Sequence, residues 1–102
     1  MNKKRLRSYQ EYLLASLLDP EEARAYLNAA LIDDDPRIFL LAIKNVIDAQ
    51  EGSIVALSQK TDLNRENLYR MLSKRGNPRL TSIKSVLNAL DLDLAVRPYQ
   101  RR

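Results

Sequence analysis

Between residues 64 and 70, six side chains carry hydrogen-bonding groups that suit the edges of DNA bases. The forked guanidinium of Arg65 fits a guanine edge, the Asn67 carboxamide fits an adenine, and the Glu66 carboxylate can accept from cytosine. Tyr69 and Arg70 follow about one helical turn later, within reach of a thymine methyl or a phosphate. The alternative interpretation is that these six residues are ordinary exposed side chains that bind nothing. We predict a surface that reads a major groove through Asn64, Arg65, Glu66, Asn67, Tyr69 and Arg70.

Basic residues flank this run on both sides, and most of them fall in a loop rich in helix-breaking residues at 74–79. Cations in such positions would lie along a nucleic-acid backbone and add affinity without sequence information, because they neutralise phosphates. A solvated basic surface explains the same residues equally well. The predicted phosphate contacts are Lys60, Lys74, Arg75, Asn77 and Arg79.

The formal net charge of +4 is unevenly distributed along the 102 residues. Residues 1–59 contain seven Lys or Arg and nine Asp or Glu, a net charge of −2. Residues 60–102 contain ten and four, a net charge of +6. Positive charge is therefore concentrated on the predicted DNA-reading helix and after it, which favours a polyanionic partner for this half.

The apolar pattern of residues 53–72 places the polar run on the second of two short helices joined by a tight turn. Ser53 and Asn64 are suited to cap these helices, and Asp62 tolerates the left-handed conformation that the turn needs. The buried face of the pair is predicted to consist of Ile54, Leu57, Leu63, Leu68, Met71 and Leu72. This arrangement is typical of a helix-turn-helix DNA-binding unit.

Helical spacing of apolar residues predicts the remaining elements and an all-α fold. Basic residues 1–8 come first, as a frayed end or a phosphate-contacting arm. Asp19–Pro20 and Asp35–Pro36 are helix start signals. The apolar run at 38–43, with residues 46 and 47, predicts burial on two sides between the amino-terminal helices and the motif. Helices are expected at 9–18, 20–31, 36–49 and from 79–82 to 90.

Residues 92–97 alternate between apolar and polar side chains until Pro98, which predicts a short strand. A lone strand cannot satisfy its own hydrogen bonds, so pairing with its copy across a two-fold axis predicts a homodimer through Leu92, Leu94 and Val96. The alternative is an extended tail packed on the last helix. We divide the chain into a helical extension (1–34), a DNA-binding domain (35–91) and a tail (92–102), within one compact domain.

The residue inventory excludes several classes of function. Without cysteine or histidine there is no disulfide, zinc site or histidine-based triad, and no other catalytic constellation is visible. We therefore predict no enzyme, no cofactor, no metal and no small-molecule substrate; the acidic run 33–35 is read as helix caps and solvated charge. No signal run or membrane-spanning apolar stretch is present, so a cytoplasmic protein is expected.

Residues 57–90, which include LNRENLYRMLSKRGNPRLTSIKSVLNAL, resemble lambda-repressor-like (Xre) helix-turn-helix domains. The pattern at 63–70 and 76–78 is similar to that of HigA-like addiction-module antidote proteins. The YLNAAL run at 26–31 and Asp35–Pro36 fit that family as well, so the resemblance covers about residues 20–97. Two positions depart from broader Xre domains: Ile54 replaces a frequent glutamine, and Asp62 replaces the usual turn glycine.

The resemblance implies an antitoxin that neutralises a RelE/ParE-superfamily (HigB-like) toxin by direct binding and represses its own operon as a dimer on operator DNA. Residues 65–70 would then read the operator. For the toxin surface, Tyr9, Tyr12, Tyr26 and Phe39 are candidate anchors, and the alternative places them in the core. The main alternative function is a stand-alone or phage-type repressor without a toxin; a module that binds only protein is a further one.

Overall fold

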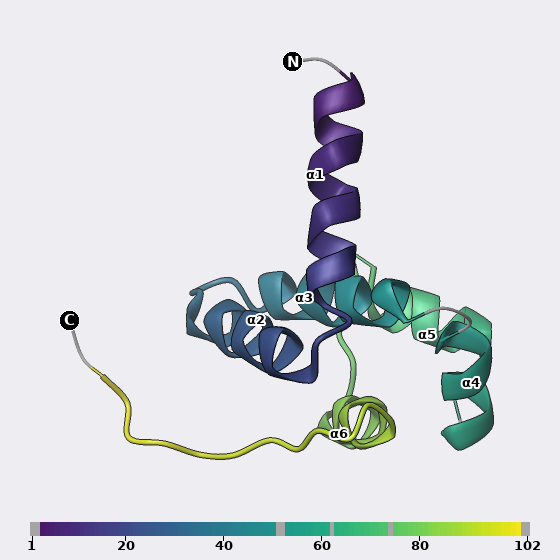
Figure 1. Ribbon diagram of the computed structural model, residues 1–102. Coiled ribbons are helices and arrows are strands. Elements are labelled where there is room, and N and C mark those ends of the chain that lie inside the picture. Colours follow the sequence, from purple (N-terminus) through teal and green to yellow (C-terminus); the bar gives the residue numbers. More distant parts are fainter. Residues whose placement is uncertain (1–2, 51–52, 62, 74, 101–102) are drawn as a thin grey trace.

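The structure, a computed structural model, describes residues 3–50, 53–61, 63–73 and 75–100; the side chains of residues 3–7, 53–55, 60 and 65 lie outside this description. Within these ranges the chain forms helices and no strand, which confirms the predicted all-α class (Figure 1). The helices are α1 (Lys3–Ser16), α2 (Pro20–Ile32), α3 (Pro36–Ala49), α4 (Ser53–Lys60), α5 (Arg65–Met71) and α6 (Leu80–Ala89).

Two helices begin with the Asp–Pro signals that the sequence predicted. The Asp19 side chain accepts a hydrogen bond of 2.9 Å from the Glu21 backbone, and Asp35 accepts one of 3.0 Å from the Arg37 backbone. Each aspartate satisfies an N–H group that has no partner inside the helix, while the proline that follows adopts helical φ without strain. Asp33 accepts from the Asp35 backbone at 2.9 Å, so two of the three acidic residues at 33–35 stabilise this helix start.

Helix α3 lies at the centre of the molecule, in contact with α1, α2 and α4 (Figure 1). The prediction that it separates the amino-terminal helices from the motif is therefore confirmed. Burial along its apolar run is less complete than expected, because Ile38 and Leu41 are 39% and 51% exposed. The residues that it buries are Phe39, Leu40, Ala42, Ile43, Val46 and Ile47.

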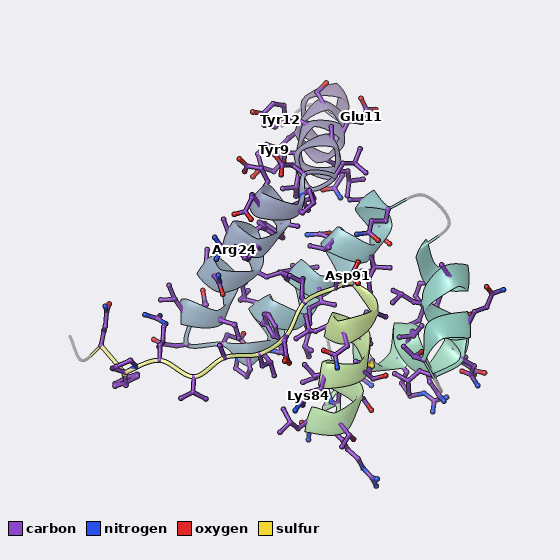
Figure 2. The ribbon with its side chains drawn as sticks, turned by 60° about the horizontal axis from the view of Figure 1, so that its bottom comes forward. Tyr9, Glu11, Tyr12, Arg24, Lys84 and Asp91 are labelled. Atoms are coloured by element: carbon purple, nitrogen blue, oxygen red, sulfur yellow. The ribbon has the colours of Figure 1, made fainter. Side chains whose placement is uncertain are left out.

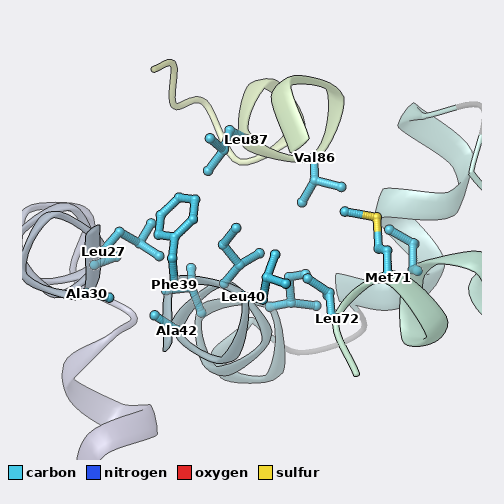
Figure 3. Packing of buried hydrophobic residues seen from close by; sticks show 14 of the residues in the cluster. Leu27, Ala30, Phe39, Leu40, Ala42, Met71, Leu72, Val86 and Leu87 are labelled. Atoms are coloured by element: carbon cyan, nitrogen blue, oxygen red, sulfur yellow. The ribbon is translucent and has the colours of Figure 1, made fainter. Parts of the chain in front are cut away.

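One continuous core joins both ends of the chain. Side chains from α2 and α3 meet side chains from α5 and α6 around Phe39 and Leu40 (Figure 3). The Asn45 side chain donates a hydrogen bond of 2.8 Å to the Tyr26 hydroxyl, which ties α3 to α2 at the edge of this core. Phe39 is buried and Tyr26 is half-buried. Of these two candidate toxin anchors, Phe39 therefore belongs to the core, and Tyr26 belongs to it in part.

Helix α1 differs most from expectation. It begins at Lys3 instead of Tyr9, because the basic residues at its start are good helix formers and continue the helix. It projects from the body of the molecule, and its contacts are made at its carboxyl end, where Leu17 is buried (Figure 1). Tyr9 and Tyr12 are 68% and 76% exposed, so the core alternative is wrong for both.

Helix α6 ends in a hydrogen-bonded cap formed around Asp91. The Leu92 backbone N–H donates to the Leu87 carbonyl at 2.8 Å, and the Asp91 N–H donates to Asn88 at 3.0 Å. These two hydrogen bonds require the residue just after the helix cap to adopt the left-handed conformation. Asp91 occupies that position and has a φ of 62°. Beyond this cap the tail leaves α6 and runs along α2.

The tail runs extended along residues 93–100 and forms no strand within the described chain (Figure 1). Leu92 and Leu94 pack against the core, lining a small space with Leu27, Phe39 and Leu87. These two predicted dimer residues are thus half-buried in their own chain, as in the packed-tail alternative, whereas Val96 is fully exposed. The strand is absent here because a single chain offers it no partner; pairing between copies stays a prediction.

Candidate nucleic-acid interface

The inner face of α5 is formed as the sequence predicted. Leu68 is 0% exposed, and Met71 and Leu72 are also buried, at positions i, i+3 and i+4 of the helix. Because these positions share one face, the residues between them point away from the core. The described side chains on that outer face are all exposed: Glu66, Asn67, Tyr69 and Arg70.

Asn64 caps α5, as predicted. Its side-chain oxygen accepts a hydrogen bond of 2.8 Å from the Asn67 backbone N–H. The carboxamide oxygen is therefore engaged by the protein, and only the NH₂ group of Asn64 is left to donate to a ligand. Of the six predicted base-contacting residues, five have described side chains; the side chain of Arg65 lies outside the described part.

The turn between α4 and α5 depends on Thr61, a residue that the sequence interpretation missed. The Thr61 hydroxyl donates to the Leu57 carbonyl at 2.8 Å and accepts from the Leu63 N–H at 3.2 Å. This hydroxyl closes the last turn of α4 and orients the chain into α5. A threonine four residues after a helical leucine is the signal that could have revealed it. Asp62, the predicted turn residue, lies outside the described residues.

Two outer-face residues of α5 pair with each other. The Arg70 guanidinium lies 3.5 Å from the Glu66 carboxylate, with side chains 71% and 81% exposed. An ion pair this exposed contributes little to stability and is readily exchanged for another partner. The pair holds Arg70 beside the amino-terminal turn of α5 without committing it to the protein.

The loop after α5 passes close to the end of that helix at Gly76. A Cβ at this position would lie 2.7 Å from the Met71 carbonyl carbon and closer still to its oxygen, so only glycine fits. The predicted phosphate contacts Arg75, Asn77 and Arg79 are exposed on this loop. Lys74 and the side chain of Lys60 lie outside the described residues.

Helix α6 begins without the caps that α2 and α3 use. Arg79 occupies the N-cap position and makes no side-chain capping hydrogen bond, and the first turn contains no acidic residue. The amino end of a helix carries partial positive charge, so a neighbouring arginine is unfavourable there unless an anion is also present. The sequence carries a signal for this uncapped start, because Pro78–Arg79–Leu80 contains no Ser, Thr, Asp or Asn. Leu80 shares the helical spacing of Ile83 and Leu87, which predicts an inward-facing side chain, but it is 62% exposed.

Other kinds of site have no counterpart in the part of the chain that the structure describes. No three acidic side chains there lie close enough together to hold a metal ion. No helix among those residues combines the length and apolarity needed to cross a membrane.

Residues 8–98 match the family described as "Probable addiction module antidote protein". The chain belongs to this family. A relative from Haemophilus influenzae, described as "Uncharacterized protein", is 33% identical over 81 residues, which cover 79% of this chain and 81% of the relative. No solved structure is significantly similar to the chain.

Family membership confirms the coarser part of the predicted identity. The chain is an addiction-module antidote, and an antidote implies a toxin partner. The finer predictions, a HigA-like protein with an Xre domain, operator binding and a RelE/ParE-superfamily toxin, are proposals. The residue-level site assignments and the division at residues 34 and 91 stay predictions, as does the cytoplasmic location.

Proposed function

We propose that this antidote binds operator DNA through a lambda-repressor-like helix-turn-helix formed by α4 and α5, and so represses its own operon. The observation that carries the proposal is the exposed polar face of α5, held on the core by Leu68 and Leu72 and bordered by the basic loop after it. A helix presented in this way fits the major groove, where its first turns meet the base edges.

Base reading and phosphate binding are assigned to different residues. Arg65, Glu66, Asn67, Tyr69 and Arg70 read bases, with the NH₂ group of Asn64 as a further donor. Arg70 leaves the Glu66 carboxylate when DNA supplies a guanine or a phosphate instead. Phosphates are bound by Lys60, Lys74, Arg75, Asn77 and Arg79. The uncapped amino end of α6 beside Arg79 supports a phosphate at that point, because its N–H groups and the guanidinium attract the same anion.

The antidote acts as a homodimer that joins two tails. Leu92 and Leu94 fix the start of each tail on its own core, and Val96 lies on the exposed extended part that meets its copy. From Asp93 to Gln100 the described backbone makes one hydrogen bond, from the Leu94 N–H to the Asp93 side chain, so the strand edge is open for pairing. A two-fold dimer of this kind reads a palindromic operator.

Toxin neutralisation is the second activity. The antidote binds its toxin, a member of the RelE/ParE superfamily, directly and without chemistry of its own. Support comes from membership of the antidote family and from the resemblance to HigA-like proteins at residues 63–70 and 76–78.

Arg65→Ala tests base reading. We expect about 10- to 100-fold weaker binding to the operator duplex, since one bidentate contact is worth about 1–3 kcal/mol of discrimination. Binding to a scrambled duplex should change far less. The matched variant Arg79→Ala should weaken both duplexes alike and lower the slope of log K against log salt by about 1. Equal losses on both duplexes for Arg65→Ala would refute its role as a base reader.

Val96→Asp tests the dimer without disturbing the core, because this side chain is fully exposed. Sedimentation should show a shift from dimer to monomer, and operator affinity should fall with it. Ala95→Asp, whose side chain points to the other side of an extended chain, is the control and should leave the dimer intact. An unchanged mass for Val96→Asp would contradict pairing through the tail.

A further inference from the structure

Helix α1 carries two exposed aromatic side chains on one face. Tyr9 and Tyr12 are 68% and 76% exposed and lie three residues apart, so they are neighbours on the helix surface. Figure 2 shows both on one side of α1 and Glu11 on the other. We call Tyr9 and Tyr12 the tyrosine face. Tyrosine is enriched at the centres of protein interfaces, because it buries a large rigid ring and keeps a hydroxyl for a hydrogen bond.

The described part of the chain does not cover this face. Leu13 and Leu17 attach the carboxyl end of α1 to the core, while the helix before them projects from the body (Figure 1). Leu18, two residues after the end of α1, is also 62% exposed. Apolar surface that stays exposed to water is unfavourable. A patch of such surface is typical of a site that binds another protein.

The charge at the carboxyl end of α1 indicates the partner. Asp19, Glu21 and Glu22 are exposed where α1 meets α2, and we call them the acidic corner. The four cations of α1 fall at its other end, at residues 3–7, whereas residues 8–50 contain eight Asp or Glu and three Lys or Arg. Carboxylates placed in this way attract a protein that has cations beside an apolar slot. Glu21 pairs with Arg24 at 3.1 Å, which leaves Glu22 as the carboxylate best placed for an outside cation.

We propose that the tyrosine face and the acidic corner form the docking surface for the toxin, which contributes an apolar slot for the two rings and a cationic rim. The proposal rests on the proposed neutralisation of a toxin by direct binding. A second copy of the antidote is the competing occupant, since four cations at residues 1–7 could face the acidic corner of a copy. A dimer already closed through its tails would then polymerise or form a tetramer, which favours the toxin instead.

The test uses the full-length antidote and the purified small protein encoded beside it in its operon. Calorimetry measures their affinity for wild type, for the double variant Tyr9→Ala/Tyr12→Ala and for Glu22→Lys. We expect the double variant to bind at least about 30-fold more weakly, as truncation of an interface hot spot does. Glu22→Lys should weaken binding more at low salt than at high salt. Tyr99→Ala, an 86% exposed tyrosine on the tail, is the matched control and should stay within about 3-fold of wild type.

Each outcome bears on one of the two proposals. Operator binding measured on the double variant shows whether it is folded, and it should equal that of wild type. Wild-type affinity that survives the double substitution overturns the docking surface and leaves toxin neutralisation standing. No binding by the wild-type antidote overturns both. The mass of the antidote is also measured without the toxin. If it falls when both tyrosines are replaced, the face binds a second copy, and the proposal is overturned.

Discussion

The two halves of this antidote are built differently. Helices α1, α2 and α3 have 14, 13 and 14 residues, and two of them begin with an aspartate cap followed by proline. Helices α4, α5 and α6 have 8, 7 and 10 residues. Helices as short as these are marginal in isolation, so the second half depends on the core that the first half supplies.

The difference extends to charge and to the exposed surfaces. The first 59 residues carry a net charge of −2 and the remaining 43 carry +6. The first half exposes two tyrosines beside carboxylates, and the second exposes polar side chains beside arginines. One core therefore supports two surfaces of opposite character, which suits the proposed binding of a protein by one half and of a nucleic acid by the other.

The largest expected effect tests whether both halves share one core. Ile47 is 0% exposed on α3, so Ile47→Ala should lower the free energy of unfolding by about 2–5 kcal/mol. Leu41→Ala, on the 51% exposed side of the same helix, should cost less than about 1 kcal/mol. Denaturant titration followed by Tyr fluorescence and by circular dichroism should give a single transition. Two separate transitions would show that the halves unfold independently.

The next effect is confined to the second half. Gly76→Ala forces a methyl group against the Met71 carbonyl, and relief of this clash should cost about 1–3 kcal/mol. Because the loop moves relative to α5, operator affinity should fall while toxin affinity is retained. Ser73→Ala, which removes only the 2.8 Å hydrogen bond to the Arg70 carbonyl, should cost about 1 kcal/mol or less. Equal operator affinity for Gly76→Ala and wild type would argue against a rigid loop.

A smaller effect separates the two roles of Asn64. Asn64→Ala removes the cap of α5 and should cost about 1 kcal/mol of unfolding free energy. Asn64→Asp keeps the cap but adds a negative charge on the proposed DNA-binding face, so its stability should be near that of wild type while its operator affinity falls. Thermal melts and duplex binding of both variants make the comparison. A stable Asn64→Asp protein with full operator affinity would place this residue outside the interface.

The smallest effect concerns pH and the first half. Hydrogen bonds from the Arg37 side chain and backbone hold the pKa of the Asp35 carboxyl below its usual value. A carboxyl with a lowered pKa stabilises the fold at neutral pH, and this contribution is lost as pH falls through that pKa. Asp35→Asn keeps a capping side chain without the charge. Wild type should therefore melt at a slightly higher temperature than the variant at pH 7, and the two should melt at the same temperature in acid. A difference that persists at low pH would assign the effect to the cap.

Local chemistry explains which parts of the fold could be predicted. The starts of α2 and α3 followed from Asp–Pro pairs, and the inner face of α5 followed from apolar spacing, because both depend on residues within a turn of one another. The exposure of Tyr9, Tyr12 and Leu80 did not follow. An apolar residue at helical spacing is buried only if another element covers it, and that neighbour comes from elsewhere in the chain.

The candidate interface shows the same division. Its residue types were evident from the sequence, and so was the i,i+4 spacing of Glu66 and Arg70 that allows their ion pair. The hydroxyl of Thr61 and the uncapped start of α6 were also present in the sequence. Their significance emerged only when the hydrogen bonds to Leu57 and Leu63, and the lack of a cap at Arg79, were known.

The sequence by itself determined an all-helical chain with two Asp–Pro helix starts, an acidic first half, a basic second half and a polar run at 64–70, since composition and short-range spacing suffice for these. The tertiary structure alone decided that α1 projects with its tyrosines exposed, and that Leu92 and Leu94 turn back onto their own core. Both outcomes depend on contacts between segments far apart in the chain. Such contacts are set by how the whole core closes, which no local pattern encodes.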